Sequence, residues 1–506
     1  MRRGYVDLVI RSGYLILPLL VAVVLSWRVQ AAGQSGPLWP AEAMPQPPRP
    51  SQPISMNMPS LYTNVYTLYL PLVHHLYDGR VRLFGVQAWE EIDSSQARSY
   101  MRQAGIRWLR TTINWAEIEP SPLPPSQYNW PTTDGRITTL VQAGFNPILT
   151  LSGNPSWAAA LPGGPVTNTQ DLVEFMSALV ERYDGDGLDD APGSPIVRYW
   201  EFYNEPDNTD YGWHCFYAGL GCFGNDPEAY AQELAAIYPA IKAANPDAQL
   251  VFGGIAMDNY PLFNPNFLDQ VLAACTGTCF DIMNFHYYPF YRWSGGWETY
   301  GRDIIGKATA VRNRLAAYGY SRPLIATEAS WPGASSWGSP ELQARYVPKL
   351  YARGIATDLG VLIWYRAADE TCEPISFMSG LLTCNFDPKL SHTAYSVFTA
   401  KLGRADYVGV VNQSDPLIES YQFRVPETSG MRRIDVTWVD CTSLDNCVSG
   451  TTPPRTYRVA ATQVRITDQF GNAIIVYDCD DGTCDGVVTR QLTDQNPIYV
   501  EYLQVP

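Results

Sequence analysis

The sequence predicts an α/β fold, a (β/α)₈ TIM barrel, followed by a C-terminal antiparallel β-sandwich domain. Between Val81 and about Leu402, short apolar runs alternate eight times with amphipathic stretches of helical period, a pattern typical of parallel βα units. Eight such pairs over about 320 residues match the size of a closed barrel. After Ala405 the pattern changes to short alternating runs broken by Asn, Asp, Gly and Pro, which predicts the sandwich. A doubly wound open sheet is the alternative for the first part, but no GxGxxG follows its first strand.

The expected barrel strands share apolar, partly alternating cores. They cover residues 81–88, 106–113, 146–153, 197–204, 249–256, 280–287, 323–330 and 360–367. Helices are expected over residues 94–104, 136–143, 168–183, 226–244, 266–274, 302–317, 339–357 and 393–401. Asn168 and Ser339 are good helix N-caps, and Pro340 suits the first helical position. The alternating runs of the sandwich begin near residues 433, 456, 472 and 496.

The N-terminus has the order of a secretory signal. Arg2, Arg3 and Arg11 precede an apolar run over residues 13–27, and small residues follow at Ala31 and Ala32. The run is short for a membrane span, which needs about 20 apolar residues. Arg28 separates it from the small residues, so an uncleaved signal anchor is the alternative.

These patterns divide the chain into four parts. We expect a signal peptide or anchor over 1–32, a Pro-rich linker and N-terminal segment over 33–78, the barrel over 79–404 and the sandwich over 405–506. The folded parts are then secreted or displayed at the cell surface, and a membrane is a partner only if the signal stays uncleaved.

Ten cysteines form five couples that are close in sequence, which predicts five disulfides in an oxidising compartment. Free thiols are the alternative, and paired CxxC spacing of a zinc site is absent from the sequence. The couples are Cys215 with Cys222, Cys275 with Cys279, Cys372 with Cys384, Cys441 with Cys447, and Cys479 with Cys484.

Charge and aromatic content narrow the class of ligand. The 35 Lys and Arg against 50 Asp and Glu give a net charge of −15, which repels a phosphate backbone, so no nucleic-acid partner is expected. The 15 Trp and 32 Tyr exceed what a core needs and suit stacking against sugars.

Two glutamates stand at the ends of expected strands. Glu205 follows the fourth strand in WEFYNEPD, and Glu328 ends the seventh in LIATEASWP. Active sites of such barrels lie at the C-terminal strand ends, and strands four and seven face each other across the barrel. Two carboxylates across a sugar-sized gap are what glycosidic bond cleavage requires, with Glu205 as acid/base and Glu328 as nucleophile. Alone, Asn-Glu-Pro is equally typical of a strand-ending turn.

The two motifs resemble those of clan A of the retaining glycoside hydrolases, whose barrels carry these glutamates after strands four and seven. Further matches are GIRWLRTTINWAEIEP on the second strand, FHYYP on the sixth and LIWYR on the eighth. Within the clan the chain looks most like family 39, the β-xylosidase and α-L-iduronidase group, which also tends to carry a β-sandwich. It departs from that pattern at Tyr203, where Trp is more usual, and LTLSGNPSWA on the third strand lacks the His-Asn pair of family 5.

The resemblance implies roles for five more residues. Arg110 would hold the carboxylate of the nucleophile, and Asn204 would donate to the sugar hydroxyl beside the reacting carbon. His286 and Tyr288 would line the pocket, with Tyr288 orienting Glu328, and Trp364 would form the floor beneath the sugar. The alternatives are a lumen ion pair for Arg110, a turn amide for Asn204, and structural packing for His286 and Trp364. Candidate residues for the rim of the pocket are Trp89, Trp115, Trp157 and Trp331.

An acidic turn predicts a calcium site. Asp184, Asp186 and Asp190 have the D-x-D-G-x-x-D spacing of short calcium loops, although a solvated turn after a helix is the alternative. A catalytic metal is not expected, since the five histidines form no HExxH pair, and no organic cofactor is implied.

The sequence therefore predicts an exported retaining glycoside hydrolase that cleaves O-glycosidic bonds of an oligo- or polysaccharide. The substrate is expected to be β-linked and xyloside- or glucoside-like. A non-catalytic carbohydrate-binding barrel at the cell surface is the alternative, because a fold does not by itself imply an activity. A transglycosylase would share every residue named above.

Overall fold

The computed structural model describes residues 83–122, 124, 127–217, 219–257, 262–275, 277–291, 296–334, 338–373, 378–428, 430–440, 454–492 and 496–505. The predicted export signal, the Pro-rich linker and the couple Cys441 with Cys447 lie outside these residues. Within them, no helix has the length and apolar character needed to cross a bilayer.

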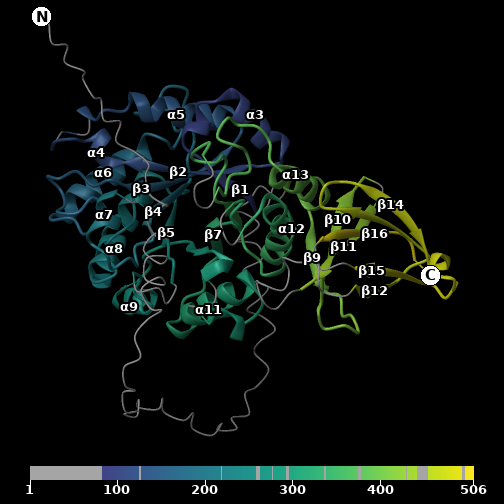
Figure 1. Ribbon diagram of the computed structural model, residues 1–506. Coiled ribbons are helices and arrows are strands. Elements are labelled where there is room, and N and C mark those ends of the chain that lie inside the picture. The colour runs from purple at the N-terminus through teal and green to yellow at the C-terminus, as the bar shows by residue number, and fades with distance from the viewer. Residues whose placement is uncertain are drawn as a thin grey trace, which may run out of the picture.

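Eight parallel strands form the barrel, in the order β5-β4-β3-β2-β1-β8-β7-β6 (Figure 1). Bridges between Val251 and Ile282 and between Ile255 and Phe285 close it between the fifth and sixth strands. The strands are β1 Leu83–Gln87, β2 Trp108–Asn114, β3 Asn146–Ser152, β4 Tyr199–Asn204, β5 Gln249–Gly254, β6 Met283–Tyr287, β7 Leu324–Ala329 and β8 Val361–Trp364. Seven lie within the expected ranges and β2 extends one residue beyond its range, to Asn114, so the predicted TIM barrel is confirmed.

Helices follow the strands and surround the barrel (Figure 1). Asn168 and Ser339 cap their helices by accepting a hydrogen bond from a backbone N–H, as expected, and Ser94 does the same for α3. The helices of eight residues or more are α3 Ser95–Gln103, α5 Pro131–Gln142, α6 Thr169–Glu181, α8 Pro227–Ala244, α9 Phe267–Ala274, α11 Ile304–Ala317, α12 Pro340–Ala356 and α13 Leu390–Leu402. Helix α5 begins five residues earlier than predicted, because Pro131 occupies its first position, where its fixed φ suits a helix.

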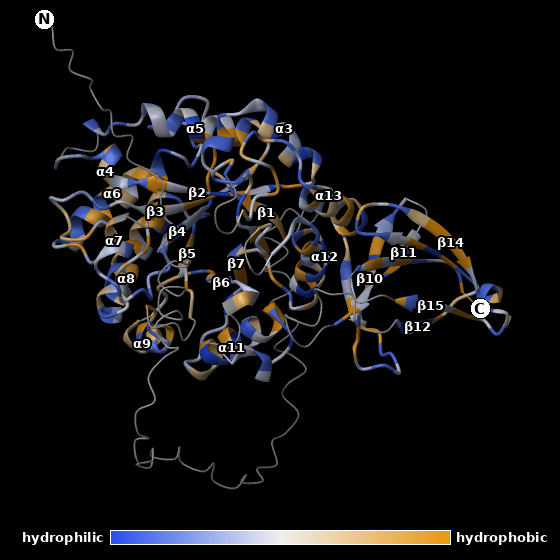
Figure 2. Ribbon diagram, viewed as in Figure 1, coloured by the Kyte–Doolittle hydropathy of each residue, from blue (hydrophilic) through white to orange (hydrophobic). Residues whose placement is uncertain are grey.

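Both faces of the barrel strands are buried, which explains their near-continuous apolar runs. One face lines the lumen, where a core cluster includes Trp108, Ile148, Tyr199, Val251, Ile325 and Ile363. The other face packs against the helices in the main core. Figure 2 shows hydrophobic residues along strands such as β7, with many hydrophilic residues on the surrounding helices and loops.

Two antiparallel sheets form the C-terminal part, and the predicted sandwich is confirmed. Six strands pair in the order β14-β13-β16-β11-β10-β9, and β12 pairs with β15 in a second, smaller sheet. Apolar residues of both sheets, Tyr457 and Val488 on the small sheet and Val464 and Val500 on the large one, share one core. The strands are β9 Asp406–Val410, β10 Ile418–Glu427, β11 Gly430–Val439, β12 Arg455–Ala460, β13 Gln463–Asp468, β14 Ala473–Tyr477, β15 Val487–Leu492 and β16 Ile498–Gln504.

The large sheet packs its other face on the barrel. Phe423, Val436, Trp438 and Tyr499 belong to the same core cluster as the apolar residues of α12 and α13. Beside Trp438, Arg353 of α12 bonds both oxygens of Glu419 at 2.8 and 2.7 Å and pairs with Asp303 at 2.8 Å. The two parts therefore share one apolar core and one buried ion cluster.

Four of the five predicted disulfides are present: Cys215–Cys222, Cys275–Cys279, Cys372–Cys384 and Cys479–Cys484. Each closes a short loop, and three of these loops belong to the barrel.

The ion cluster predicts a stability change. Replacing Arg353→Ala removes the cation that bonds the buried carboxylates of Glu419 and Asp303, and leaves Glu419 with the longer pair to Arg302 at 3.5 Å. The free energy of unfolding from urea titration should therefore fall by about 3–5 kcal/mol. In the control Arg314→Ala, which breaks a half-exposed pair with Asp269 at 3.3 Å, the loss should stay below about 1 kcal/mol. Equal losses in the two variants would show that the buried cluster does not join the sandwich to the barrel.

Candidate active site

Glu205 is the first residue after β4, at the point where the chain turns out of the strand. Tyr203 and Glu205 both have positive φ, 60° and 45°, a backbone conformation that residues other than glycine rarely adopt. The backbone N–H of Glu205 donates to the Gly254 carbonyl on β5 at 3.0 Å, and the buried Tyr203 hydroxyl donates to Asn154 at 2.8 Å. These contacts hold the strained turn, and strain of this kind concentrates at functional sites.

Glu328 on β7 has both carboxylate oxygens engaged. Arg110 Nη1 donates to Oε1 at 2.7 Å, and the Tyr288 hydroxyl donates to Oε2 at 2.5 Å. The side chain of Glu328 is 10 % exposed, so one edge still meets the cavity. The carboxylate is therefore fixed in direction while it stays accessible. The predicted contacts of Arg110 and Tyr288 with Glu328 are both present.

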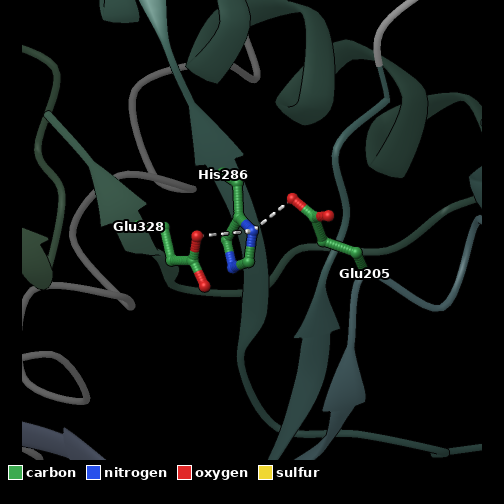
Figure 3. A group of neighbouring side chains, drawn as sticks. All are labelled: Glu205, His286 and Glu328. Atoms are coloured by element: carbon green, nitrogen blue, oxygen red, sulfur yellow. Dashed lines mark hydrogen bonds and ion pairs between the residues drawn. The ribbon is translucent and has the colours of Figure 1, made fainter. Parts of the chain in front are cut away.

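His286 on β6 lies between the two glutamates (Figure 3). Its Nδ1 is 2.9 Å from Glu205 Oε1 and 3.7 Å from Glu328 Oε2, and its Nε2 is 3.1 Å from the Thr327 hydroxyl. Burial lowers the pKa of His286 to about 4, so the imidazole is neutral at neutral pH. A neutral imidazole donates from one ring nitrogen and accepts at the other, so Nδ1 can donate to a deprotonated Glu205 or accept from a protonated one.

Carboxylate oxygens of Glu205 and Glu328 and a ring nitrogen of His286 all lie within 4.8 Å of one another. This set of ligand types also suits a metal ion. However, the oxygens of Glu328 already accept bonds from Arg110 and Tyr288, and a guanidinium cation at 2.7 Å opposes a second cation there. The arrangement fits acid, base and nucleophile chemistry better than metal binding.

Glu201 is a site residue that the sequence analysis missed. It accepts from Arg110 Nε at 2.6 Å and Nη2 at 2.9 Å, from Thr150 and Asn284 at 2.8 Å each, and from the Gly254 N–H at 3.0 Å. Burial alone would raise the pKa of Glu201, but the charge and hydrogen bonds of Arg110 outweigh it and lower the pKa below its ordinary value. The sequence feature that could have indicated Glu201 is a lone acidic residue inside an otherwise apolar strand.

Asp207, two residues after Glu205, is a second missed residue. It is fully buried and accepts from the backbone N–H groups of Ala256 and Met257 at 3.1 and 2.7 Å. Burial and the nearby charge of Glu205 raise the pKa of Asp207 to about 7. Its role is to fasten the loop that carries Glu205 to the loop after β5.

A cavity of about 260 Å³ opens beside Glu328. Arg110, Asn204 and Glu328 line it, together with side chains from the ends of β1, β2 and β8 and from α5. The side-chain oxygen of Asn204, Oδ1, accepts from Arg110 Nη2 at 2.7 Å. The side-chain nitrogen, Nδ2, is left to donate to a ligand.

The predicted role of Trp364 is wrong. Its side chain is fully buried in the core between strands and helices, and its Nε1 donates to the Ser379 carbonyl at 2.8 Å. The alternation of β8 explains this, because Val361 and Ile363 face the lumen, whereas Leu362 and Trp364 face the helices. The next residue, Tyr365, lines the cavity instead.

Of the four candidate rim tryptophans, Trp89 lines the cavity. Trp115 is fully buried and stacks on Phe175 at 5.0 Å, so its assignment to the rim is wrong: its position opening helix α4 (Trp115–Ile118) turns it into the core. Trp157 and Trp331 are half-buried and pack against other aromatic rings.

The predicted calcium loop brings together Asp184 and Asp186, with Glu181 as third neighbour. Asp190 is engaged differently, because its oxygens accept from the N–H groups of Gly185 and Gly187 at 3.1 Å each. Burial and the neighbouring acidic charges raise the pKa of Glu181 and of Asp184. Calcium binding there stays a prediction.

No protein-family profile and no curated protein sequence matches the chain. Solved structures do. A family 39 glycoside hydrolase from Bacteroides cellulosilyticus WH2 is 19 % identical with a TM-score of 0.60, over 85 % of this chain and 82 % of its own. A glucosidase from Croceicoccus marinus is 15 % identical with a TM-score of 0.55. A family 51 α-L-arabinofuranosidase from Bifidobacterium longum is 14 % identical with a TM-score of 0.54. Both alignments cover 83 % of this chain and 96 % of the other. The resemblance to clan A is thus confirmed at the level of the fold.

The buried His286 predicts a pH dependence of stability. The folded pKa of about 4 lies below the unfolded value of about 6.5, so the unfolded chain binds the proton first as the pH falls. This contribution is fully present above pH 6.5 and is lost towards pH 4. Between pH 7 and pH 4, urea unfolding should show the wild type losing about 3 kcal/mol more than His286→Gln. Parallel pH profiles for the two proteins would contradict a neutral, buried imidazole.

Proposed function

We propose that the protein is a retaining glycoside hydrolase in which Glu328 is the nucleophile and Glu205 the acid/base. The observation that carries this proposal is the pair of carboxylates from opposite strands, with oxygens within 4.8 Å of each other. Retaining enzymes hold their carboxyl groups about 5–5.5 Å apart, whereas inverting enzymes need about 6.5–9.5 Å to admit a water. The shared fold with a family 39 glycoside hydrolase supports the same reaction class.

In the first step, a carboxylate oxygen of Glu328 attacks the anomeric carbon while Glu205 donates its proton to the leaving oxygen. The bond between the anomeric carbon and the leaving oxygen breaks, and a glycosyl ester forms on Glu328. In the second step, Glu205 takes a proton from water, whose oxygen displaces Glu328 and restores both carboxyl groups. Two inversions at one carbon leave its configuration unchanged.

The remaining groups position these two carboxyls. Arg110 and Tyr288 aim Glu328 at the anomeric carbon, and Asn204 donates to the hydroxyl on the adjacent carbon, a contact that strengthens in the transition state. The neutral His286 holds the deprotonated carboxylate of Glu205 through Nδ1. Tyr365, in the place that the sequence suggested for Trp364, presents an aromatic ring to the sugar.

The substrate we propose is a β-linked glycoside of the xyloside or glucoside type, and the place of action is outside the cytoplasm. Four disulfides within the described residues support an oxidising compartment. The N-terminal pattern of an export signal agrees with this location.

The proposal is tested by hydrolysis of 4-nitrophenyl β-xyloside, 4-nitrophenyl β-glucoside and plant β-glycans. NMR identifies the anomer that is released first. The wild type should cleave at least one substrate with retention. Glu328→Gln should lose at least about 1,000-fold in kcat, because it removes the nucleophile. Glu205→Gln should lose about 100- to 10,000-fold, and less when a 2,4-dinitrophenyl leaving group makes protonation unnecessary.

Glu233→Gln of α8 is the matched control. Burial raises the pKa of Glu233 to about 8, so this carboxyl is already neutral at pH 7 and an amide replaces it with little change. Its kcat should stay within about twofold of the wild type. Inversion at the anomeric carbon would overturn the assigned mechanism. Sugar binding without cleavage, unchanged in all variants, would identify a binding protein.

A further inference from the structure

One wall of the cavity holds an arginine with unused hydrogen-bond donors. The side chain of Arg366, just after β8, is 9 % exposed, and its guanidinium lies 4.6 Å from the centre of the Trp89 ring. The carboxylates of Glu91, Glu90 and Glu370 lie 3.5, 3.8 and 3.9 Å away, too far for short charged hydrogen bonds. Among the residues that the structure describes, none accepts a hydrogen bond from its buried Nε.

Other polar atoms of the same cavity share this property. Within the described part of the chain, buried atoms without a hydrogen-bond partner include Gln87 Nε2, Thr111 Oγ1, Asn114 Oδ1 and Arg136 Nε, and all four residues line the cavity. These atoms are covered, although their residues line the cavity. A buried polar atom left without a partner costs about 1–3 kcal/mol, so a ligand toward which these side chains turn would recover that free energy by supplying the partners.

The types of these atoms indicate hydroxyl groups. Gln87, Arg136 and Arg366 offer donors, whereas Asn114 offers an acceptor and Thr111 offers both. A sugar hydroxyl both donates and accepts, so it can satisfy either kind. A carboxylate or sulfate only accepts and would leave the Asn114 oxygen without a donor.

The charges of the wall also disfavour an anionic ligand. Arg136 and Arg366 line the cavity together with Glu117 and Glu370, and Glu90 and Glu91 stand behind Arg366. Four carboxylates around two guanidinium groups leave this end of the cavity with a negative balance. A neutral ligand meets no repulsion there.

This wall is separated from the reacting centre by one aromatic ring. The ring centre of Tyr365 lies 6.3 Å from that of Tyr288, which bonds Glu328, and 6.1 Å from that of Trp89. Arg366 follows Tyr365 in the chain and contacts the Trp89 ring. Glu328, Tyr365 and Arg366 all line the cavity, so a ligand that spans from Glu328 to Arg366 can lie along Tyr365.

We propose that Arg366, Trp89 and Glu370 form a second sugar-binding subsite that takes a neutral sugar unit. The guanidinium donates to the oxygens of neighbouring hydroxyls and the Glu370 carboxylate accepts from one of them. The inference rests on the proposed function, and it specifies the substrate class: neutral chains of two or more sugars, in preference to single glycosides and to acidic chains.

Isothermal titration calorimetry on Glu328→Gln protein tests the subsite without turnover. The probes are xylose and xylotriose, glucose and cellotriose, and trigalacturonic acid. In one neutral series the trisaccharide should bind at least tenfold more tightly than the monosaccharide. Adding Arg366→Met should weaken trisaccharide binding about 10- to 100-fold, the effect of lost charged hydrogen bonds, with less than about threefold change for the monosaccharide. Trigalacturonic acid should bind more weakly than the neutral chain.

Arg314→Met, on the outside of α11, removes the same charge away from the cavity and should change no affinity. Arg366→Lys keeps the charge but loses the planar fork, so it should lose at least about threefold and serves as the test if Arg366→Met does not fold. Three results would each overturn the subsite: trisaccharide affinity that is unchanged by substitution of Arg366, tighter binding of trigalacturonic acid than of the neutral trisaccharides, or no binding of any neutral trisaccharide. Hydrolysis of aryl glycosides by the wild type reports on the proposed function separately, so either proposal fails without the other.

Discussion

The rest of the site depends on one buried cation, the guanidinium of Arg110. It is 2 % exposed and donates to Glu201, Glu328, Asn204 and Gln87, side chains from three other strands. A charge so far from water is tolerated only when it is fully paired, and this requirement fixes the positions of its partners. Arg110 with Glu201 and Glu328 carries a net charge of −1. When Glu328 becomes a neutral ester in the proposed reaction, Arg110 and Glu201 remain as a balanced pair, and no isolated charge is left in the barrel.

The scaffold around this cation is built so that it stays rigid. The lumen below is filled by apolar side chains such as Trp108 and Ile325, and Asp207 ties the loop of Glu205 to the loop after β5. The sandwich adds a second layer, because its large sheet covers α12 and α13 and shares their core. Rigid strand ends hold catalytic groups more precisely than loops do.

Most of the framework could be predicted from the sequence, because the two-residue and helical periods of apolar residues reflect burial directly. That Glu205 and Glu328 lie close together was also predictable, because the ends of strands four and seven face each other across the barrel. Glu201 could not be assigned, because its partner Arg110 is 91 positions away and only the closed barrel brings them together. Trp364 and Tyr365 show the other limit: a shift of one residue in a strand exchanges lumen for helix layer, and the composition of LIWYR fits both registers.

The central claim is that Glu328 forms a covalent bond to the sugar, and trapping that intermediate tests it most directly. A 2-deoxy-2-fluoro-β-glycosyl fluoride of xylose or glucose reacts readily in the first step but slows the second, so the ester accumulates. Mass spectrometry after peptic digestion should place one fluorosugar on the peptide that contains Glu328, and the Glu328→Gln protein should remain unlabelled. A label on Glu205, or an enzyme that cleaves substrates with retention and is labelled elsewhere, would contradict the account.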